Sequence, residues 1–470
     1  MAGTPGRRTT TTRGKPVKQA LTYGGPLAAL ALHFWLTGSG WEFAPAATAA
    51  ITFLCALWWI FEPVEIPITS MIPLALFPLF GILTPAQVGQ SYGSPLILLM
   101  LGGFLISEAM ADSGAHRRIA LYMVRLFGGN NARGLVMGFM AASALLSMWI
   151  SNTATTLMLL PVALAVLAHA HARLAVPLLL GIAYAASIGG LGTPIGTPPN
   201  LVFMQVYENS FGNAPSFPQW MGFGLPVVII LVPLAALWLT RGLKLDSPVE
   251  VPAVGQWRPV EKRVMILFVI TAVAWVTRSA PFGGWSEWLG LPKANDASVA
   301  LIAAVVMAMT PAGNGQRVLR WEAAKKMPWE VLILFGSGIT IATAFMQSGL
   351  ADIIATRLSV LETIPPLLVI LATCLVVTFL TEVTSNTATS SLLMPLLASA
   401  AGAMDIDPML LMVPAAMSAS CAFMLPVATA PNAVIYGSGR VTVREMARNG
   451  LMLNLIGALV ITGVCYWLLA

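Results

Sequence analysis

Two copies of one five-residue motif are the residues best suited to bind an ion. Ser-Asn-Thr-Ala-Thr occurs at residues 151–155 and again at 385–389, and each copy interrupts a long apolar run. Lipid offers no hydrogen bonds, so hydroxyl and amide groups at membrane depth must find partners in protein, water or a bound ion. Two identical motifs therefore predict one binding site that is built twice.

Each motif presents neutral hydrogen-bonding groups and no charge. The amide and hydroxyl groups of Asn152 and Thr153 suit a carboxylate or a sulfate, particularly where helix N-termini point at the same place. Hydroxyl, amide and backbone oxygens are also good ligands for a hard cation such as sodium. Because neither motif contains lysine or arginine, we expect bound cations to balance the charge of a bound anion.

A plainer interpretation is that these Ser, Thr and Asn side chains only join helices by hydrogen bonds. The duplication of the whole pattern favours a site instead. Glu382 precedes the second motif by three residues, where the first copy has Met148. An intramembrane carboxylate is a functional candidate by default. Glu382 could carry protons or orient the motif, and a purely structural role is the alternative. We do not expect it to be a direct ligand.

The composition identifies a polytopic membrane protein. Hydrophobic residues make up 57% of the 470 residues and charged residues only 9%, against roughly 25% charged in soluble domains. The net charge is +6, but the basic residues are dispersed among short loops between apolar spans, which excludes a nucleic-acid-binding surface. The four cysteines show no disulfide or zinc pattern, and no nucleophile–base pair indicates an enzyme.

The motifs lie near the middle of two unusually long apolar stretches, 133–170 and 364–402. A single membrane span needs only about 20 residues, so each stretch predicts a re-entrant hairpin with its motif at the tip. Pro161 and Pro395 each follow the first serine of their motif by ten residues, so the returning arms match as well.

The spans that follow the hairpins are both interrupted by proline, one within 189–200 and the other within 425–432. Proline and glycine there predict broken helices. Asn200 lies 48 residues after Asn152, and Asn432 lies 46 residues after Asn386. Tip, proline and break recur in one order, so the chain contains an internal repeat.

Charge predicts the orientation of the chain. With a cytoplasmic N-terminus, eleven crossings and two hairpins that return to their own side, 22 of the 25 lysines and arginines fall in inner loops. So strong a bias obeys the positive-inside rule. The scheme places the C-terminus outside and makes the two repeats inverted, as in many secondary transporters.

At these motifs the sequence closely resembles the divalent anion:sodium symporter family, which contains di- and tricarboxylate transporters and sulfate transporters. The resemblance runs from about residue 20 to the end. The family signature is a Ser-Asn-Thr motif at each of two hairpin tips, and this sequence contains both copies. It implies an all-α fold of eleven transmembrane helices with two inverted repeats, each with a re-entrant hairpin and a broken helix. It also implies a homodimer and an elevator mechanism.

The resemblance further implies the residues that bind the ions and the substrate. One departure is Ala430, where many members carry proline, and Thr384 would contribute its carbonyl. The implied first sodium ligands are Ser147, Ser151, Asn152 and Gly196; the second are Thr381, Thr384, Asn386 and Ala428; the substrate residues are Asn152, Thr153, Asn386, Thr387, Thr197 and Thr429.

The expected domain organisation follows from the repeats. Hairpins and broken helices would form a transport domain, and the remaining spans a scaffold. The expected parts are a disordered basic cytoplasmic tail (1–19), scaffold (20–130 and 245–360) and transport domain (131–244 and 361–470).

The leading hypothesis is an inner-membrane protein that takes up a C4 dicarboxylate such as succinate, malate or fumarate, coupled to at least two sodium ions. Sulfate or tricarboxylate symport, or sodium-independent dicarboxylate exchange on the same fold, are the alternatives. An intramembrane enzyme or assembly protein is disfavoured. The expected partners are a small dianion, the lipid bilayer and a second copy of the chain.

Overall fold

The structure, a computed structural model, describes residues 15–127, 131–168, 170–243, 255–279, 283–313, 315–358, 364–404 and 406–470. The predicted disordered tail falls largely outside these ranges. Its last residues do not, because the first helix begins at Lys15, so the prediction is wrong for residues 15–19. The predicted domain boundary at residues 244–245 also lies outside the described residues.

The described chain is almost entirely helical, which confirms the predicted all-α polytopic fold class. Two short strands, β1 (Pro311–Gly313) and β2 (Gln316–Arg317), pair antiparallel. In chain order the helices of the first half are α1 Lys15–Gly38, α2 Phe43–Phe61, α3 Ile66–Thr69, α4 Ile72–Leu79, α5 Pro85–Tyr92, α6 Pro95–Ser113, α7 Ala115–Phe127, α8 Ala132–Ser147, α9 Asn152–Leu167, η1 Ala172–Leu174, α10 Ala175–Gly189, η2 Gly190–Gly192, α11 Pro198–Phe211 and α12 Phe217–Leu239. Those of the second half are α13 Pro259–Val276, α14 Gly284–Trp288, α15 Asp296–Met309, α16 Trp321–Lys325, α17 Trp329–Gln347, α18 Leu350–Leu358, α19 Pro366–Thr381, α20 Asn386–Ala403, α21 Pro408–Ala419, α22 Ala430–Gly437 and α23 Val443–Leu469.

Within the described residues, 6 helical stretches are long and apolar enough to cross a membrane. Those stretches are Phe43–Phe61, Pro85–Ser113, Ala172–Gly192, Phe217–Leu239, Trp329–Gln347 and Val443–Leu469. Length and composition alone do not establish the predicted number of eleven. Residues 65–83 do not form one helix, because α3 ends at Thr69 and α4 begins at Ile72.

Both predicted hairpins are present. The first consists of α8 and α9 with its tip at 148–151, and the second of α19 and α20 with its tip at 382–385. Arms α8, α9 and α19 have 16 residues each, or about 24 Å of helix. The hydrocarbon core is about 30 Å thick, so an arm of this length reaches into it and turns back.

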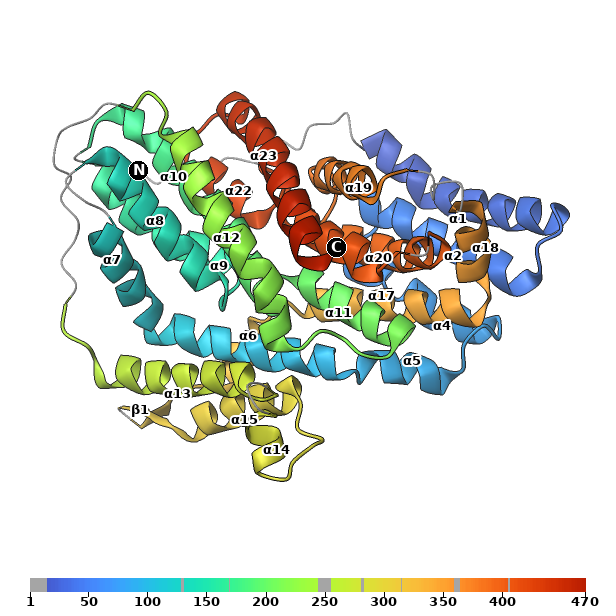
Figure 1. The fold of residues 1–470 in the computed structure, drawn as a ribbon, viewed down its shortest axis with the longest axis horizontal. Coiled ribbons are helices and arrows are strands. Elements are labelled where there is room, and N and C mark those ends of the chain that lie inside the picture. The colour runs from blue at the N-terminus through green and yellow to red at the C-terminus, as the bar shows by residue number, and fades with distance from the viewer. Residues whose placement is uncertain are drawn as a thin grey trace, which may run out of the picture.

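Both predicted broken helices are also present, and they cross between the repeats. The unwound segment 190–197 separates α10 from α11, and 420–429 separates α21 from α22. Helix α11 packs on α20 and α21 of the second repeat, while α22 packs on α9 and α10 of the first. Each repeat therefore supplies half of a helix to the other. The closing helices α12 and α23 lie side by side across the front of the molecule (Figure 1).

The backbone of each unwound segment lies against a glycine of the closing helix. A Cβ added at Gly224 on α12 would lie 2.2 Å from Leu191 O, and one at Gly450 on α23 would lie 2.2 Å from Phe423 O. Only a residue without a side chain permits so close an approach. In both repeats, a glycine on the closing helix therefore lets the backbone of the break pack closely against that helix.

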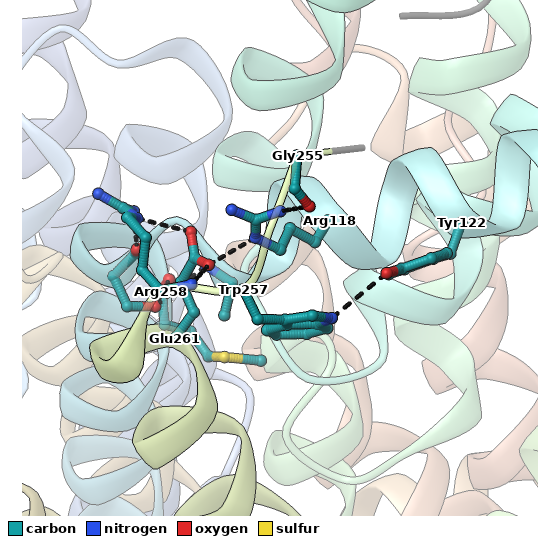
Figure 2. A network of polar contacts seen from close by, with 9 residues as sticks. Arg118, Tyr122, Gly255, Trp257, Arg258 and Glu261 are labelled. Atoms are coloured by element: carbon teal, nitrogen blue, oxygen red, sulfur yellow. Dashed lines mark hydrogen bonds and ion pairs between the residues drawn. The ribbon is translucent and has the colours of Figure 1, made fainter. Parts of the chain in front are cut away.

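An ion-pair cluster around the buried Glu261 joins α7 to the start of α13 (Figure 2). The Glu261 carboxylate, which is 3% exposed, accepts from Arg118 Nε at 2.5 Å and from Arg258 Nε at 2.8 Å. Trp257 stacks on Tyr122 with ring centroids 6.3 Å apart. Helix α7 is amphipathic, and a search for long apolar spans did not predict it. The cluster fixes this short helix against α13.

We expect Glu261→Gln to lower the unfolding free energy by about 2 kcal/mol, because it removes the charge-assisted hydrogen bond to the largely buried Arg118, whereas the exposed Arg258 stays solvated. Asp112→Asn is the matched control. Asp112 pairs with Lys326 at 3.0 Å, but both side chains are well exposed, and such pairs contribute at most about 1 kcal/mol. Thermal unfolding of the purified variants in detergent measures both effects. Equal shifts for the two variants would contradict the cluster's structural role.

Gly450→Ala is expected to destabilise the protein by about 2 kcal/mol or more, because the added methyl group overpacks the backbone of the break. Gly463 lies on the same helix, and a Cβ added there would have no atom within 4 Å. Gly463→Ala should therefore be neutral or slightly stabilising, as alanine is the better helix former. Unfolding temperatures of the two variants distinguish these outcomes, and an unchanged value for Gly450→Ala would be inconsistent with the close approach.

Candidate functional site

The first tip forms where α8 ends and α9 begins. Ser151 is the N-cap of α9, and its Oγ accepts from the backbone N–H of Ala154 at 3.2 Å. Serine is among the preferred N-cap residues because its oxygen satisfies an otherwise unpaired amide. Ser147, the last residue of α8, places its Oγ 2.6 Å from Asn152 Oδ1. The tip thus brings two of the predicted sodium ligands into contact.

The side chain of Asn152 lies in a cluster of oxygen atoms. Its amide oxygen faces Ser147 Oγ, and the carbonyls of Ala186 and Gly196 lie at 3.2 and 3.3 Å from the same position. Exchanging the amide oxygen and nitrogen would create three hydrogen bonds there. The Ser147 hydroxyl and the carbonyls of Ala186 and Gly196 are hard oxygen donors, and the chemistry of this donor set suits a sodium ion. Ala186 is a cluster member that the sequence did not indicate.

The second tip repeats this arrangement. Thr381 Oγ1 lies 2.8 Å from Asn386 Oδ1 and 2.9 Å from Ala419 O, so its single proton is shared between these two acceptors. Thr381 and Asn386 are five residues apart, as are Ser147 and Asn152. The Thr384 hydroxyl instead contacts Leu380 O and Thr389 Oγ1. The side chain of Thr384 is therefore committed elsewhere, and only its backbone remains for a ligand.

Two asparagines hold the unwound segments in shape. Asn200 Nδ2 donates to Gly190 O at 2.9 Å and to Thr193 O at 2.8 Å. Asn432 Nδ2 donates to Ala422 O and Leu425 O, each at 3.0 Å. The sequence separations are 10 and 7 in both cases. Sequence reasoning used these asparagines only as markers of the repeat. Their matching positions after the prolines of the two breaks were the sequence signal from which this role could have been predicted.

The two breaks meet directly. Thr197 Oγ1 lies 3.2 Å from Ser420 Oγ, and both residues are buried. Thr429 is the N-cap of α22, with its hydroxyl accepting from Asn432 N at 3.3 Å. Ala430 begins that helix and is followed by Pro431, so the missing proline at residue 430 does not prevent the helix from starting. Ser420 is a contact that sequence reasoning missed.

Both tips and both breaks line one cavity of about 880 Å³. All of the predicted substrate residues border it. Ser147, Thr381 and Glu382 do not line the cavity; the first two hydrogen-bond to Asn152 and Asn386 from behind. The predicted residues that line it are Ser151, Asn152, Thr153, Gly196, Thr197, Thr384, Asn386, Thr387, Ala428 and Thr429.

The electrostatics of the cavity come from backbone rather than from charged side chains at the tips. Helices α9, α11, α20 and α22 all begin at residues that line it: Asn152, Pro198, Asn386 and Ala430. A helix N-terminus carries a partial positive charge and free N–H groups, which favours anions. The charged residues that line the same cavity are Glu62, Glu108, Lys326 and Glu330, and none of them belongs to a tip. The tips themselves therefore combine neutral oxygen clusters with four favourable dipoles.

Comparisons with known proteins agree with this architecture. The family model described as "Citrate transporter" matches residues 56–413. The sodium-dependent dicarboxylate transporter SdcS of Staphylococcus saprophyticus is 37% identical over 445 residues, covering 89% of this chain and 85% of the relative. The transporter of the same name from Staphylococcus aureus strain MRSA252 is also 37% identical, with 89% and 85% coverage.

Among solved structures, the YdaH transporter of Alcanivorax borkumensis superposes with a TM-score of 0.56 at 17% sequence identity, covering 83% of this chain and 87% of that one. At this identity the likeness concerns the fold alone. The family match and the 37% identical relatives, together with the paired tips, identify the chain as a member of the divalent anion:sodium symporter family.

Proposed function

We propose that the chain is a sodium-coupled symporter that carries a C4 dicarboxylate, such as succinate, malate or fumarate, into the cytoplasm. The observation that carries the proposal is the single cavity into which both tips and both breaks project. It is supported by relatives whose names describe sodium-dependent dicarboxylate transporters. The transporter class, rather than an enzyme, follows from the same family membership.

At least two sodium ions would bind, one behind each tip. The first would use the oxygens of Ser147, Ser151, Asn152 and Gly196, and the second those of Thr381, Thr384, Asn386 and Ala428. Asn152 and Asn386 belong to both the cation and the substrate sets, so a bound cation fixes the amide that the substrate meets. Coupling then follows because the anion binds best to the protein whose tips are already ordered.

The substrate would lie between the tips. One carboxylate would meet Asn152 and Thr153, and the other Asn386 and Thr387, with Thr197 and Thr429 beside them. Sodium ions and helix N-termini together would balance the two negative charges, which explains how the tips bind a dianion without lysine or arginine.

Transport would proceed by an elevator motion of residues 131–244 and 361–470 against the scaffold, residues 20–130 and 245–360, in a homodimer. Helix α11 packs on α20 and α21, α22 packs on α9 and α10, and α12 packs on α23, so the two repeats are held together as one moving unit would require. The protein would lie in the inner membrane with its N-terminus cytoplasmic and its C-terminus outside. Lys326 lines the cavity and would lie in an inner loop under the positive-inside scheme, so the cavity would open to the cytoplasm.

A tricarboxylate or sulfate is the second candidate substrate. The family description names citrate transport, and neutral amide and hydroxyl groups do not distinguish sharply among these anions. Sodium-independent exchange remains the alternative mechanism on the same cavity.

Proteoliposomes should accumulate labelled succinate when an inward sodium gradient is imposed and should not do so when choline replaces sodium. Unlabelled malate and fumarate should compete, and citrate or sulfate should compete weakly. Uptake that does not depend on sodium would refute the coupling. Stronger competition by citrate or sulfate than by malate and fumarate would favour the second candidate, a tricarboxylate or sulfate, as the substrate.

Ser147→Ala and Thr381→Ala should each raise the sodium concentration for half-maximal uptake about tenfold, since a hydrogen bond or contact to a charged group contributes about 1.5–3 kcal/mol. Thr387→Ala should mainly raise the KM for succinate. Ser143→Ala is the matched control, because Ser143 lies one turn before Ser147 and donates to Ile182 O at 2.7 Å instead of to the tip. Initial uptake rates over a sodium titration provide the measurement. The assignment fails if the control shifts sodium dependence as much as Ser147→Ala does.

A further inference from the structure

We propose that Glu382 is a positioning residue for the second cation site, and that its buried carboxylate gives this site a higher sodium affinity than the tip alone would have. The inference deepens the proposed sodium-coupled function and rests on it. Glu382 is 3% exposed and does not line the cavity, so it acts through the groups that it holds.

The carboxylate of Glu382 collects four N–H donors from two other elements. Oε1 accepts from Phe423 N at 2.7 Å and from Met424 N at 2.8 Å, and Oε2 accepts from Leu425 N at 3.0 Å. Asn454 on α23 donates its Nδ2 to Oε1 at 2.8 Å. Every contact is a donor to a carboxylate oxygen, which suits the ionised form and makes these charge-assisted hydrogen bonds.

These contacts connect the second tip to the break on the other side of the cation site. Glu382 follows the last residue of α19, Thr381, whose hydroxyl contacts Asn386. Leu425, which Glu382 holds by its N–H, accepts in turn from Ala428 N at 3.2 Å. The carboxylate thus ties the tip to the backbone that leads to Ala428. Both sides of the proposed ligand set are held by one side chain.

The first repeat has no such group, which makes the two cation sites unequal. Position 148, equivalent to 382, is methionine, and its backbone carbonyl accepts from the hydroxyl of Thr193. Thr193 corresponds to Leu425, because each lies seven residues before the asparagine that holds its break. A neutral hydrogen bond in one repeat is therefore replaced in the other by a carboxylate that accepts from four N–H donors. In a low-dielectric interior, a nearby fixed negative charge favours a bound cation.

The test is a sodium titration of thermal unfolding in detergent, with choline chloride keeping the ionic strength constant, because ligand binding raises the unfolding temperature. Glu382→Gln should increase the sodium concentration for half-maximal stabilisation about tenfold, and the KM for succinate at saturating sodium should stay within about twofold of wild type. A tenfold change corresponds to about 1.4 kcal/mol.

Glu261→Gln is the matched control. Glu261 is also 3% exposed and also accepts from several N–H donors, but it lies in the α7–α13 cluster and does not line the cavity. The Glu261→Gln substitution should lower the unfolding temperature in choline and leave the half-saturating sodium concentration unchanged. Asn454→Ala removes one donor and retains the carboxylate. It should raise the half-saturating concentration by about two- to threefold, and it decides the question if Glu382→Gln does not fold.

The outcomes are separable. If Glu382→Gln or, failing that, Asn454→Ala lowers the unfolding temperature in choline with sodium dependence unchanged, Glu382 is a structural residue only and the inference is overturned. If sodium stabilises the wild-type protein and drives succinate uptake, the proposed function stands in either case. If sodium does neither, the proposed function and the inference both fall.

Discussion

The need to satisfy backbone hydrogen bonds inside a bilayer governs this structure. Two helices are interrupted at membrane depth, and an exposed unwound backbone in lipid would cost several kcal/mol for each unpaired group. Asn200 and Asn432 each reach back to two carbonyls of their own break. This arrangement gives the break a fixed shape, so its remaining carbonyl and amide groups are presented to the cavity in a defined geometry.

The cavity is a consequence of that constraint. Because each half of a broken helix packs against the opposite repeat, the starts of α11 and α22 arrive beside the starts of α9 and α20. Four helix N-termini around one space place the partial positive charge of uncharged backbone beside both tips. Oxygen clusters behind the tips supply the complementary environment for cations. The proposed anion and cation sites would therefore arise from opposite ends of the same local structure, and neither would require a permanently charged residue at the tip.

The sequence predicted this core well because its signals were local and duplicated. Two identical motifs, prolines at equal offsets and paired asparagines located the hairpins and breaks. The short helices were missed for a physical reason, since α7 and α18 bury one face against protein and do not form long apolar runs. Contacts between residues that are far apart in the sequence could not be predicted either. Nothing in the sequence indicated that Thr197 would meet Ser420, or that Glu382 would face the backbone at 423–425.

The Glu261 cluster has a consequence for how the first repeat is attached. Arg118 comes from the connection that leads into the first hairpin, and Arg258 from the connection that follows α12 (Figure 2). The chain therefore enters and leaves this repeat at one anchored place beside α6 and α13. Both connections of the first repeat are therefore held by one carboxylate, so loss of Glu261 would loosen the entry and the exit of this repeat together.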